Sequence, residues 1–294
     1  MPHILKNENL EVHIDLPNEN YQSSRFDWTG KIQSVYFQGI PFSITEKNDH
    51  QNEHLFGKGF YNEFGIETAL GFEEAEIGEW FHKIGIGLLK KNESDYYFHK
   101  ELEIKPAEFS VNANPACIEI VCASEALNGY TYILFKKIEL LENGFLVSYT
   151  LENTGEKDII TDEYTHNFLS INNQPVSPNY ALSFPFALMS SEFEELVDPE
   201  EKIILGETKV SFSGKTTDQF FIGRLAGNQS TRAQWELINS SQKIGIREIA
   251  SFQAQKVNLW GWKHVISPEL FHNIHLKPGE LTKWNRRYQI FRID

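Results

Sequence analysis

The stretch 162–172, which reads DEYTHNFLSIN, contains the side chain best suited to acid–base chemistry. His166 lies at its centre, and an imidazole titrates near pH 6.5, so it can donate or accept a proton close to neutrality. In an extended chain alternate side chains point to the same face, which predicts that Tyr164, His166 and Phe168 share one face. A lone histidine in a strand is more often structural than catalytic. The stretch alone leaves both roles open.

A second candidate is Glu269, which follows a tryptophan-rich run. Trp260 and Trp262 flank Gly261, and Glu269 comes seven residues after the second tryptophan. Flat aromatic rings suit the apolar faces of a pyranose, and a carboxylate accepts hydrogen bonds from its hydroxyls. A sugar site is therefore one interpretation. A pair of core tryptophans, with Glu269 as a solvated turn residue, is an equally good one.

Arg25 is a third candidate, in the run Arg25-Phe26-Asp27-Trp28. Its planar guanidinium offers five donors in a fixed fork, which suits the binding of a polar ligand. On a strand Arg25 and Asp27 would point the same way. The alternative to ligand binding is therefore an ion pair between these two residues.

The segment 55–89 differs in composition from the rest of the chain. Seven glycines recur in it among glutamates that include Glu63 and Glu74. It is too glycine-rich for a regular helix and too acidic for a core, which favours a long ordered loop that lines a functional cleft. An acidic surface loop is the other interpretation.

Other chemistries have little support in the sequence. His272 and His275 have a spacing that chelates a metal on a helix, but their surroundings indicate a strand, where the two would diverge, so no metal site is expected. Nucleophilic catalysis is not indicated, because no Gly-x-Ser-x-Gly motif occurs and neither cysteine has an activating context. No glycine motif that cradles phosphate occurs either. Cys117 and Cys122 would point to opposite faces of a strand, which argues against a disulfide between them.

Strand patterns dominate the elements that must position these residues. Alternating runs between turn residues predict strands at 10–16, 30–39, 96–104, 116–123, 130–140, 146–152, 209–213, 219–225, 234–239, 244–249, 256–262 and 282–291. A short helix is expected at 191–197, where Ser191 and Glu194 have capping-box spacing and Pro199 follows. No linker or repeat divides the chain. The pattern predicts one antiparallel all-β domain, 1–294.

Composition excludes some classes of partner. The formal net charge is -14. This argues against nucleic acid and against anionic membrane surfaces, both of which need a positive footprint. No apolar run approaches the roughly 18 residues of a membrane span, and the first residues lack the apolar core of a signal peptide. A cytoplasmic location is the default expectation.

Three stretches in order resemble the galactose mutarotase-like (aldose 1-epimerase) superfamily. The first is the turn Asn153-Thr154-Gly155 with the His166 strand that follows it. The second is Glu269 with the turn Pro278-Gly279-Glu280 and the final strand. The third is the segment 24–30, which is similar to an amino-terminal strand that supplies a sugar-binding arginine, here Arg25. The resemblance spans nearly the whole chain and implies a large antiparallel β-supersandwich with few short helices.

The resemblance also implies an activity. His166 would be the general acid that protonates the ring oxygen of a free sugar, and Glu269 the general base that takes the anomeric hydroxyl proton. The ring then opens and closes again as the other anomer, without a metal or organic cofactor. The expected partner is a small-molecule carbohydrate. Candidate substrate-binding residues are Arg25, Glu63, Glu74, His82, Lys83, Asn167, Trp260 and Trp262.

The chain departs from the family pattern in two places. Asn167 follows His166, whereas many members place the asparagine before the histidine. The second family histidine is also missing from its usual motif, and His54, His82 or Lys83 could replace it. These departures concern the identity of the sugar more than the reaction.

Two other functions stay open. The chain could be a carbohydrate-binding or regulatory protein that keeps the fold without catalysis. It could also be a glycoside hydrolase or lyase that pairs Glu269 with Glu63 or Glu74.

Overall fold

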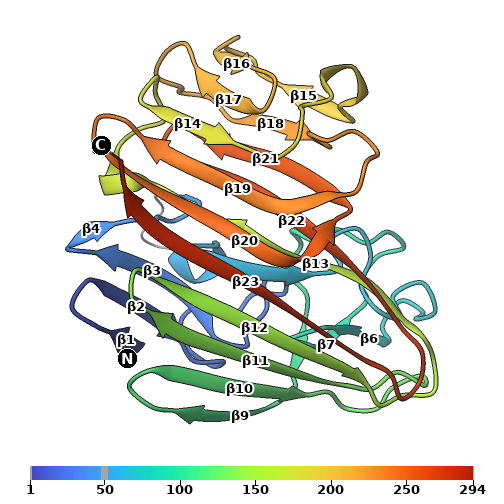
Figure 1. Ribbon diagram of the computed structural model, residues 1–294. Coiled ribbons are helices and arrows are strands. Elements are labelled where there is room, and N and C mark those ends of the chain that lie inside the picture. The colour runs from blue at the N-terminus through green and yellow to red at the C-terminus, as the bar shows by residue number, and fades with distance from the viewer. Residues whose placement is uncertain (1, 48–51, 294) are drawn as a thin grey trace.

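The protein is built almost entirely of antiparallel strands, which form two large sheets and one small sheet (Figure 1). The structure is a computed structural model that describes residues 2–47 and 52–293. In this part of the chain the helical segments are short 3-10 turns, at η1 (Glu53–Leu55), η2 (Ile171–Asn173) and η3 (Ser190–Glu192). The predicted all-β supersandwich with few short helices is confirmed.

The first large sheet carries the stretch around His166. Its strands are β1 (His3–Lys6), β2 (Leu10–Asp15), β3 (Lys31–Phe37), β4 (Ile40–Pro41), β5 (Phe60–Phe64), β13 (Ile159–Asn167), β15 (Glu195–Val197), β18 (Phe220–Gly223), β21 (Lys256–Trp262) and β22 (Val265–Leu276). They are ordered β1-β2-β3-β5-β13-β22-β21-β18-β15, and β4 pairs with β3.

The second large sheet packs against the first. Its strands are β9 (Glu108–Ala113), β10 (Cys117–Ala123), β11 (Tyr132–Leu141), β12 (Gly144–Asn153), β14 (Tyr180–Ser183), β16 (Ile203–Leu205), β17 (Lys209–Phe212), β19 (Thr231–Asn239), β20 (Ile244–Ala254) and β23 (Leu281–Arg292). They are ordered β16-β17-β14-β19-β20-β23-β12-β11-β10-β9. The small sheet consists of β6 (Trp80–Lys83), β7 (Gly87–Lys90) and β8 (Ile104–Pro106).

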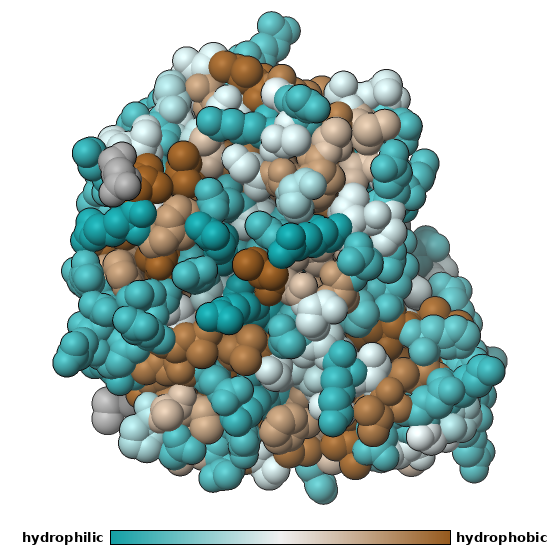
Figure 2. Space-filling view, in the orientation of Figure 1, coloured by the Kyte–Doolittle hydropathy of each residue, from teal (hydrophilic) through white to brown (hydrophobic). Residues whose placement is uncertain are grey.

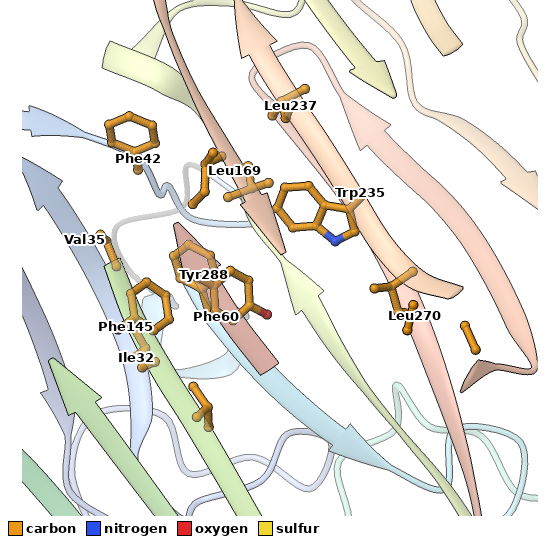
Figure 3. Close-up of a cluster of buried hydrophobic side chains, with 14 of the residues drawn as sticks. Ile32, Val35, Phe42, Phe60, Phe145, Leu169, Trp235, Leu237, Leu270 and Tyr288 are labelled. Atoms are coloured by element: carbon orange, nitrogen blue, oxygen red, sulfur yellow. The ribbon is translucent and has the colours of Figure 1, made fainter. Parts of the chain in front are cut away.

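Apolar side chains from both large sheets fill the space between them (Figure 3). Phe60 of β5 lies against Phe145 of β12 and Tyr288 of β23, with ring centroids 5.2 and 4.9 Å away. Edge-to-face contacts of this kind add to the burial of large rings, each of which contributes about 1.5–3 kcal/mol. The strands supply these rings because alternate positions, such as Phe145 and Val147, face inward.

A chain of buried charges interrupts this apolar core. Arg286 of β23 donates from Nη2 to Glu163 Oε2 of β13 at 2.7 Å, and from Nη1 to Glu248 Oε1 of β20 at 2.6 Å. All three side chains are 0% exposed. Burial of charge without a partner is costly, so each oxygen and donor here depends on its neighbour. The chain of charges therefore ties the second sheet to the strand that bears His166.

The contact between Arg286 and Glu163 fixes which side chains of β13 face the core. Glu163, Thr165 and Asn167 face the space between the sheets: Thr165 Oγ1 accepts from Asn62 Nδ2 at 2.8 Å, and Asn167 Oδ1 accepts from the Tyr288 hydroxyl at 3.1 Å. The even-numbered residues must then point to the opposite face. The predicted common face of Tyr164, His166 and Phe168 is confirmed by ring contacts between successive members.

Most predicted strands are present, but the helix expected at 191–197 is wrong. A 3-10 turn at η3 is followed by β15, in which Leu196 pairs with Ile222 of β18. A helix of so few residues is marginal by itself, whereas pairing with β18 satisfies the backbone at once. Tertiary pairing therefore overrides the capping signal.

Two further expectations are also wrong. Residues 96–104 are not a strand, since only Ile104 belongs to one and the ring of Tyr96 packs on Phe72 and Phe81. Segment 55–89 is not one long loop, because it contains β5, β6 and most of β7. Gly59 shows why the composition misled: a Cβ there would lie 2.1 Å from the Ile32 carbonyl oxygen, so this glycine allows two strands to approach closely.

The surface is mixed in polarity, and both cysteines are free thiols. Figure 2 shows hydrophilic side chains spread among small hydrophobic areas on the face seen in Figure 1. Cys117 is partly exposed, Cys122 is buried, and both are free thiols, as their opposite faces predicted. Across residues 2–47 and 52–293, no helix has the length and apolar character needed to cross a bilayer.

Arg286→Met tests the buried charges. The substitution keeps the side-chain length but leaves Glu163 and Glu248 without their cation, so we expect the free energy of unfolding to fall by about 3–5 kcal/mol. Urea denaturation measures this. Arg287→Met on the same strand is the matched control, because Arg287 is exposed and its loss should change stability by less than about 0.5 kcal/mol. Equal effects of the two variants would contradict the structural role of Arg286.

Candidate functional site

The candidate site lies on the face of the first sheet that points away from the second. The ladder between β13 and β22 ends at the pair Glu163 and His272. A bridge between Leu169 and Ile266 joins the two segments again further on. Between these points the strands form a seam, the stretch over which β13 and β22 face each other without ladder pairing.

Side chains replace ladder bonds along the seam. The Pro268 carbonyl accepts from Asn167 Nδ2 at 2.6 Å, and the Leu270 carbonyl accepts from Arg286 Nη2 at 2.9 Å. The backbone N–H of Asn167 donates to Ser267 Oγ at 3.0 Å. A proline fits this place because its missing N–H is not needed for a ladder. The interpretation of Glu269 as a turn residue is therefore wrong, since it lies within β22.

His166 and Glu269 meet across the seam, with Nε2 of the histidine 3.4 Å from Oε1 of the glutamate. Nδ1 of His166 lies 2.9 Å from Ser267 Oγ. The imidazole stacks on Phe168 with a centroid distance of 4.0 Å, and the edge of Trp260 approaches it with a distance of 5.1 Å. These contacts fix the plane of the ring and leave its Nε2 facing the carboxyl group.

Arg25 lies beside this pair in a network of polar side chains. Its Nε donates to Glu63 Oε2 at 2.9 Å and its Nη2 to the Tyr164 hydroxyl at 3.0 Å. The guanidinium lies between two rings, 4.4 Å from the centroid of Phe26 and 4.5 Å from that of Phe98. Stacking and hydrogen bonding together hold the group in one orientation.

The alternative ion pair between Arg25 and Asp27 is wrong. Asp27 Oδ2 instead accepts from Lys136 Nζ at 3.2 Å, inside the core. The run 24–30 is also not a strand, so the two side chains are not held on a common face. Arg25 is thus available to the site.

Lys83 belongs to the same network but is fully committed. Its Nζ donates to Glu63 Oε1 at 3.3 Å, to the Gly65 carbonyl at 3.1 Å and to the Tyr96 hydroxyl at 2.7 Å. An ammonium has three donors. Lys83 therefore holds Glu63 in place and has no donor left for a ligand.

Other sequence candidates lie outside this cluster. Glu74 is an exposed partner of Lys157, and Asn167 faces the core on the opposite side of β13. His82 is buried against Tyr130 and Tyr132, and its burial lowers its pKa to about 4. His54 is exposed.

Of the tryptophan and metal-binding histidine candidates, only Trp260 lies at the site. Trp262 is partly exposed and donates from Nε1 to the Thr217 carbonyl at 3.2 Å, whereas Trp260 contacts His166. His272 is partly buried against Phe252, and the exposed His275 pairs with Asp158. Over the described ranges, no group of three or more potential ligand residues is placed to hold a metal ion.

Burial makes the His166 and Glu269 pair neutral. It lowers the pKa of His166 well below 6.5, and the positive charge of Arg25 lowers it further. Burial raises the pKa of Glu269 to about 8, and the negative charge of Glu63 adds to the rise while Arg25 opposes it. At pH 7 the contact thus joins an uncharged imidazole and a protonated carboxyl group.

The pair is almost closed to solvent. His166 and Glu269 are each 4% exposed. Five surface hollows of about 270 to 510 Å³ lie elsewhere, and each is lined by described residues other than these two and Arg25.

Two members of the cluster, Tyr164 and Ser267, were not among the predicted site residues. Tyr164 was assigned to the correct face but given no role, although its hydroxyl donates to Glu63 Oε2 at 2.7 Å. Ser267 received none, although it touches both His166 and Glu269. The period of two could have found it, because Ser267 and Glu269 are two apart on one strand.

Comparisons with known proteins bear on the fold. No protein-family model and no curated protein matches the sequence. Among solved structures, a protein of Escherichia coli provisionally named an aldose 1-epimerase is similar at 10% identity over 100% of this chain and 99% of the other, with a TM-score of 0.64. The galactose mutarotase related enzyme from Lactobacillus acidophilus has 10% identity over 100% and 99%, with a TM-score of 0.60. A galactose mutarotase-like protein from Clostridium acetobutylicum has 12% identity over 99% and 95%, with a TM-score of 0.60.

The chain thus has the galactose mutarotase-like fold. At 10–12% identity such likeness establishes the arrangement of strands and not the reaction. The chemistry must be argued from the side chains of the site.

Glu269→Gln tests the protonation of the pair. The folded chain keeps the Glu269 proton up to about pH 8, whereas an unfolded glutamate releases it near 4.5. The folded state therefore binds more protons between these values, and the stability that Glu269 contributes is lost as pH rises. We expect Glu269→Gln to gain stability relative to the wild type from pH 5 to 8, by up to about 1.4 kcal/mol per pH unit.

Urea denaturation at pH 5, 6, 7 and 8 measures this difference. Glu207→Gln, which removes an exposed carboxyl group, controls for the loss of one negative charge. A difference between Glu269→Gln and the wild type that does not change with pH would show that Glu269 is ionised in the folded chain throughout this range.

Proposed function

We propose that the protein is a mutarotase that interconverts the α and β anomers of a free aldose or sugar derivative. One observation carries the proposal: Nε2 of His166 and Oε1 of Glu269 lie 3.4 Å apart across the seam, and both side chains are buried beside Arg25. Opening a hemiacetal ring needs one proton donor and one proton acceptor at two oxygens of the same sugar. A pair with a single proton provides both.

Binding of the sugar must separate the pair. A pyranose that takes the place of the direct contact brings hydroxyl groups to Glu269, and hydrogen bonds to a carboxylate favour its charged form. The proton of Glu269 can then pass to His166 Nε2. This gives an imidazolium opposite a carboxylate, the acid and base that the resemblance implies.

The reaction then proceeds without loss or gain of protons. His166 Nε2–H protonates the ring oxygen, Glu269 takes the anomeric hydroxyl proton, and the bond between C1 and the ring oxygen breaks to give an aldehyde. After rotation about the bond between C1 and C2, the ring oxygen attacks the other face of C1. Glu269 returns its proton to the former carbonyl oxygen, and His166 recovers its proton from the ring hydroxyl.

Arg25 and Trp260 are placed to orient the sugar. Arg25 Nη2 and Nε are bound to Tyr164 and Glu63, so the guanidinium is held rigidly beside the pair. Trp260 approaches the His166 ring with its edge and can offer its face to a pyranose. Rigid groups cost little entropy when the substrate binds.

The carbohydrate-binding alternative is less favoured, because a protein that only binds a sugar needs neither titrating group, and this site brings both together. The hydrolase or lyase alternative is weaker. Glu74 lies at the surface with Lys157, and both oxygens of Glu63 are bound, to Arg25 and Lys83.

His166→Asn and Glu269→Gln test the mutarotase proposal. Each removes one half of the acid–base pair, so we expect each to slow anomer exchange by at least about 100-fold. Exchange spectroscopy by NMR over a panel of free aldoses measures the rate and identifies the sugar. His275→Asn and Glu207→Gln make the same changes at exposed positions and should leave the rate unchanged.

The panel also separates the alternatives. No acceleration for any aldose, with sugar binding still detectable, would overturn the mutarotase proposal in favour of a binding protein. Turnover of an oligosaccharide but not of a free sugar would favour a hydrolase or lyase.

The pH dependence of kcat/KM is a separate prediction. Free enzyme with one proton on the pair is the active form, and this form is lost when Glu269 releases its proton near pH 8. Below that, the rate should be level through pH 6.5, because His166 takes a second proton only at much lower pH. Rates corrected for spontaneous mutarotation should therefore be flat from about pH 6 to 7.5 and fall above about pH 8. A fall on acidification from pH 7.5 to 6 would contradict this assignment.

A further inference from the structure

Ser267 lies fully buried between the two members of the pair. Its Oγ is 2.9 Å from His166 Nδ1 and 3.4 Å from Glu269 Oε1, and it accepts the backbone N–H of Asn167 at 3.0 Å. It is 0% exposed, so bulk water does not reach the hydroxyl. Its three contacts determine how the protons of the site are arranged.

Counting donors and acceptors selects one arrangement. A serine hydroxyl has one donor and two lone pairs, and the Asn167 N–H occupies one lone pair. If His166 Nδ1–H donates to the other lone pair, the serine O–H can donate to Glu269 Oε1. Nε2 of His166 then carries no proton and faces the Glu269 carboxyl group. The polar hydrogens of His166 and Ser267 each have a hydrogen-bond acceptor.

The opposite arrangement leaves a donor unsatisfied. If the serine O–H donates to Nδ1, the proton of the neutral imidazole must lie on Nε2. The contact of Nε2 with Glu269 Oε1, at 3.4 Å, is longer than the roughly 2.7–3.2 Å of an ordinary N–H···O hydrogen bond. A buried donor without an acceptor is costly, so the first arrangement is preferred.

We infer that Ser267 is a positioning residue that keeps a proton on His166 Nδ1, so that Nε2 alone exchanges protons with Glu269 and the sugar. The inference about the tautomer stands on the contacts of Ser267. Its kinetic consequence rests on the proposed function. In that reaction Nδ1–H stays bound to Ser267 while Nε2 gains the Glu269 proton, passes it to the ring oxygen and recovers it.

The tautomer of His166 can be read directly. In protein with ¹⁵N-labelled histidine, long-range ¹H–¹⁵N correlation distinguishes Nδ1–H from Nε2–H, and the spectrum of His166→Gln identifies the His166 signals. At pH 7 we expect the neutral Nδ1–H tautomer in the wild type. An Nε2–H tautomer in the wild type would overturn the inference, and this measurement needs no variant of Ser267 to fold.

Ser267→Ala and Ser267→Thr provide the second test. Ser267→Ala removes the acceptor for Nδ1–H, so we expect Nε2–H to appear, whereas Ser267→Thr keeps a hydroxyl and should restore Nδ1–H. Ser124→Ala is the matched control, because Ser124 Oγ also accepts a backbone N–H, from Tyr132 at 2.7 Å, away from the site. An unchanged His166 tautomer in folded Ser267→Ala would contradict the inference.

Kinetics distinguish the positioning role from a structural one. We expect Ser267→Ala to lower kcat by roughly 10- to 100-fold with little change in KM, the range seen when partners that orient functional histidines are removed. Because the serine O–H lowers the pKa of Glu269, the fall in kcat/KM above pH 8 should move to higher pH. A raised KM with unchanged kcat would contradict positioning. If the wild type shows no anomer exchange, the proposed function fails, and the tautomer spectra still decide the role of Ser267.

Discussion

The pairing of Arg286 with Glu163 and Glu248 is the interaction on which the rest of the structure depends. A guanidinium in an apolar core is stable only where all its donors are bound, and here they reach β13, β20 and the Leu270 carbonyl of β22. A slip of β13 by one residue would place Glu163 on the other face and His166 in the core. The buried cation therefore fixes which side chains the open face of the sheet presents.

Apolar surroundings also control the protonation of His166 and Glu269. His166 and Glu269 lie among Phe168, Trp260 and Phe26, where separated charges are unfavourable. At rest the pair is uncharged and in contact. In the proposed reaction the hydroxyl groups of a bound sugar would allow the charges to separate, so the reactive form would be produced only when the substrate is present.

The sequence predicted what depends on neighbouring residues. The period of two placed Tyr164, His166 and Phe168 on one face, and the same rule should have excluded Asn167, which lies between them on the other. It could not reveal that Arg25 meets Tyr164, 139 residues away, because that contact depends on the pairing of distant strands. Glu63 and Glu74 share one glycine-rich composition, yet one is buried in β5 and the other is exposed. The composition of a segment does not predict which of its glutamates will be buried in a strand.

Pro268 has a consequence for the dynamics of the sheet. Most neighbouring strands of the first sheet are joined by continuous ladders, but the seam around Pro268 is held by the side chains of Asn167, Arg286 and Ser267. Opening it breaks a few side-chain hydrogen bonds and leaves the ladders of β13 with β5 and of β22 with β21 intact. The seam is thus a place where the sheet can open locally at a small fraction of its global unfolding free energy. In the described residues, this place of local opening lies beside His166 and Glu269, the pair on which the proposed reaction depends.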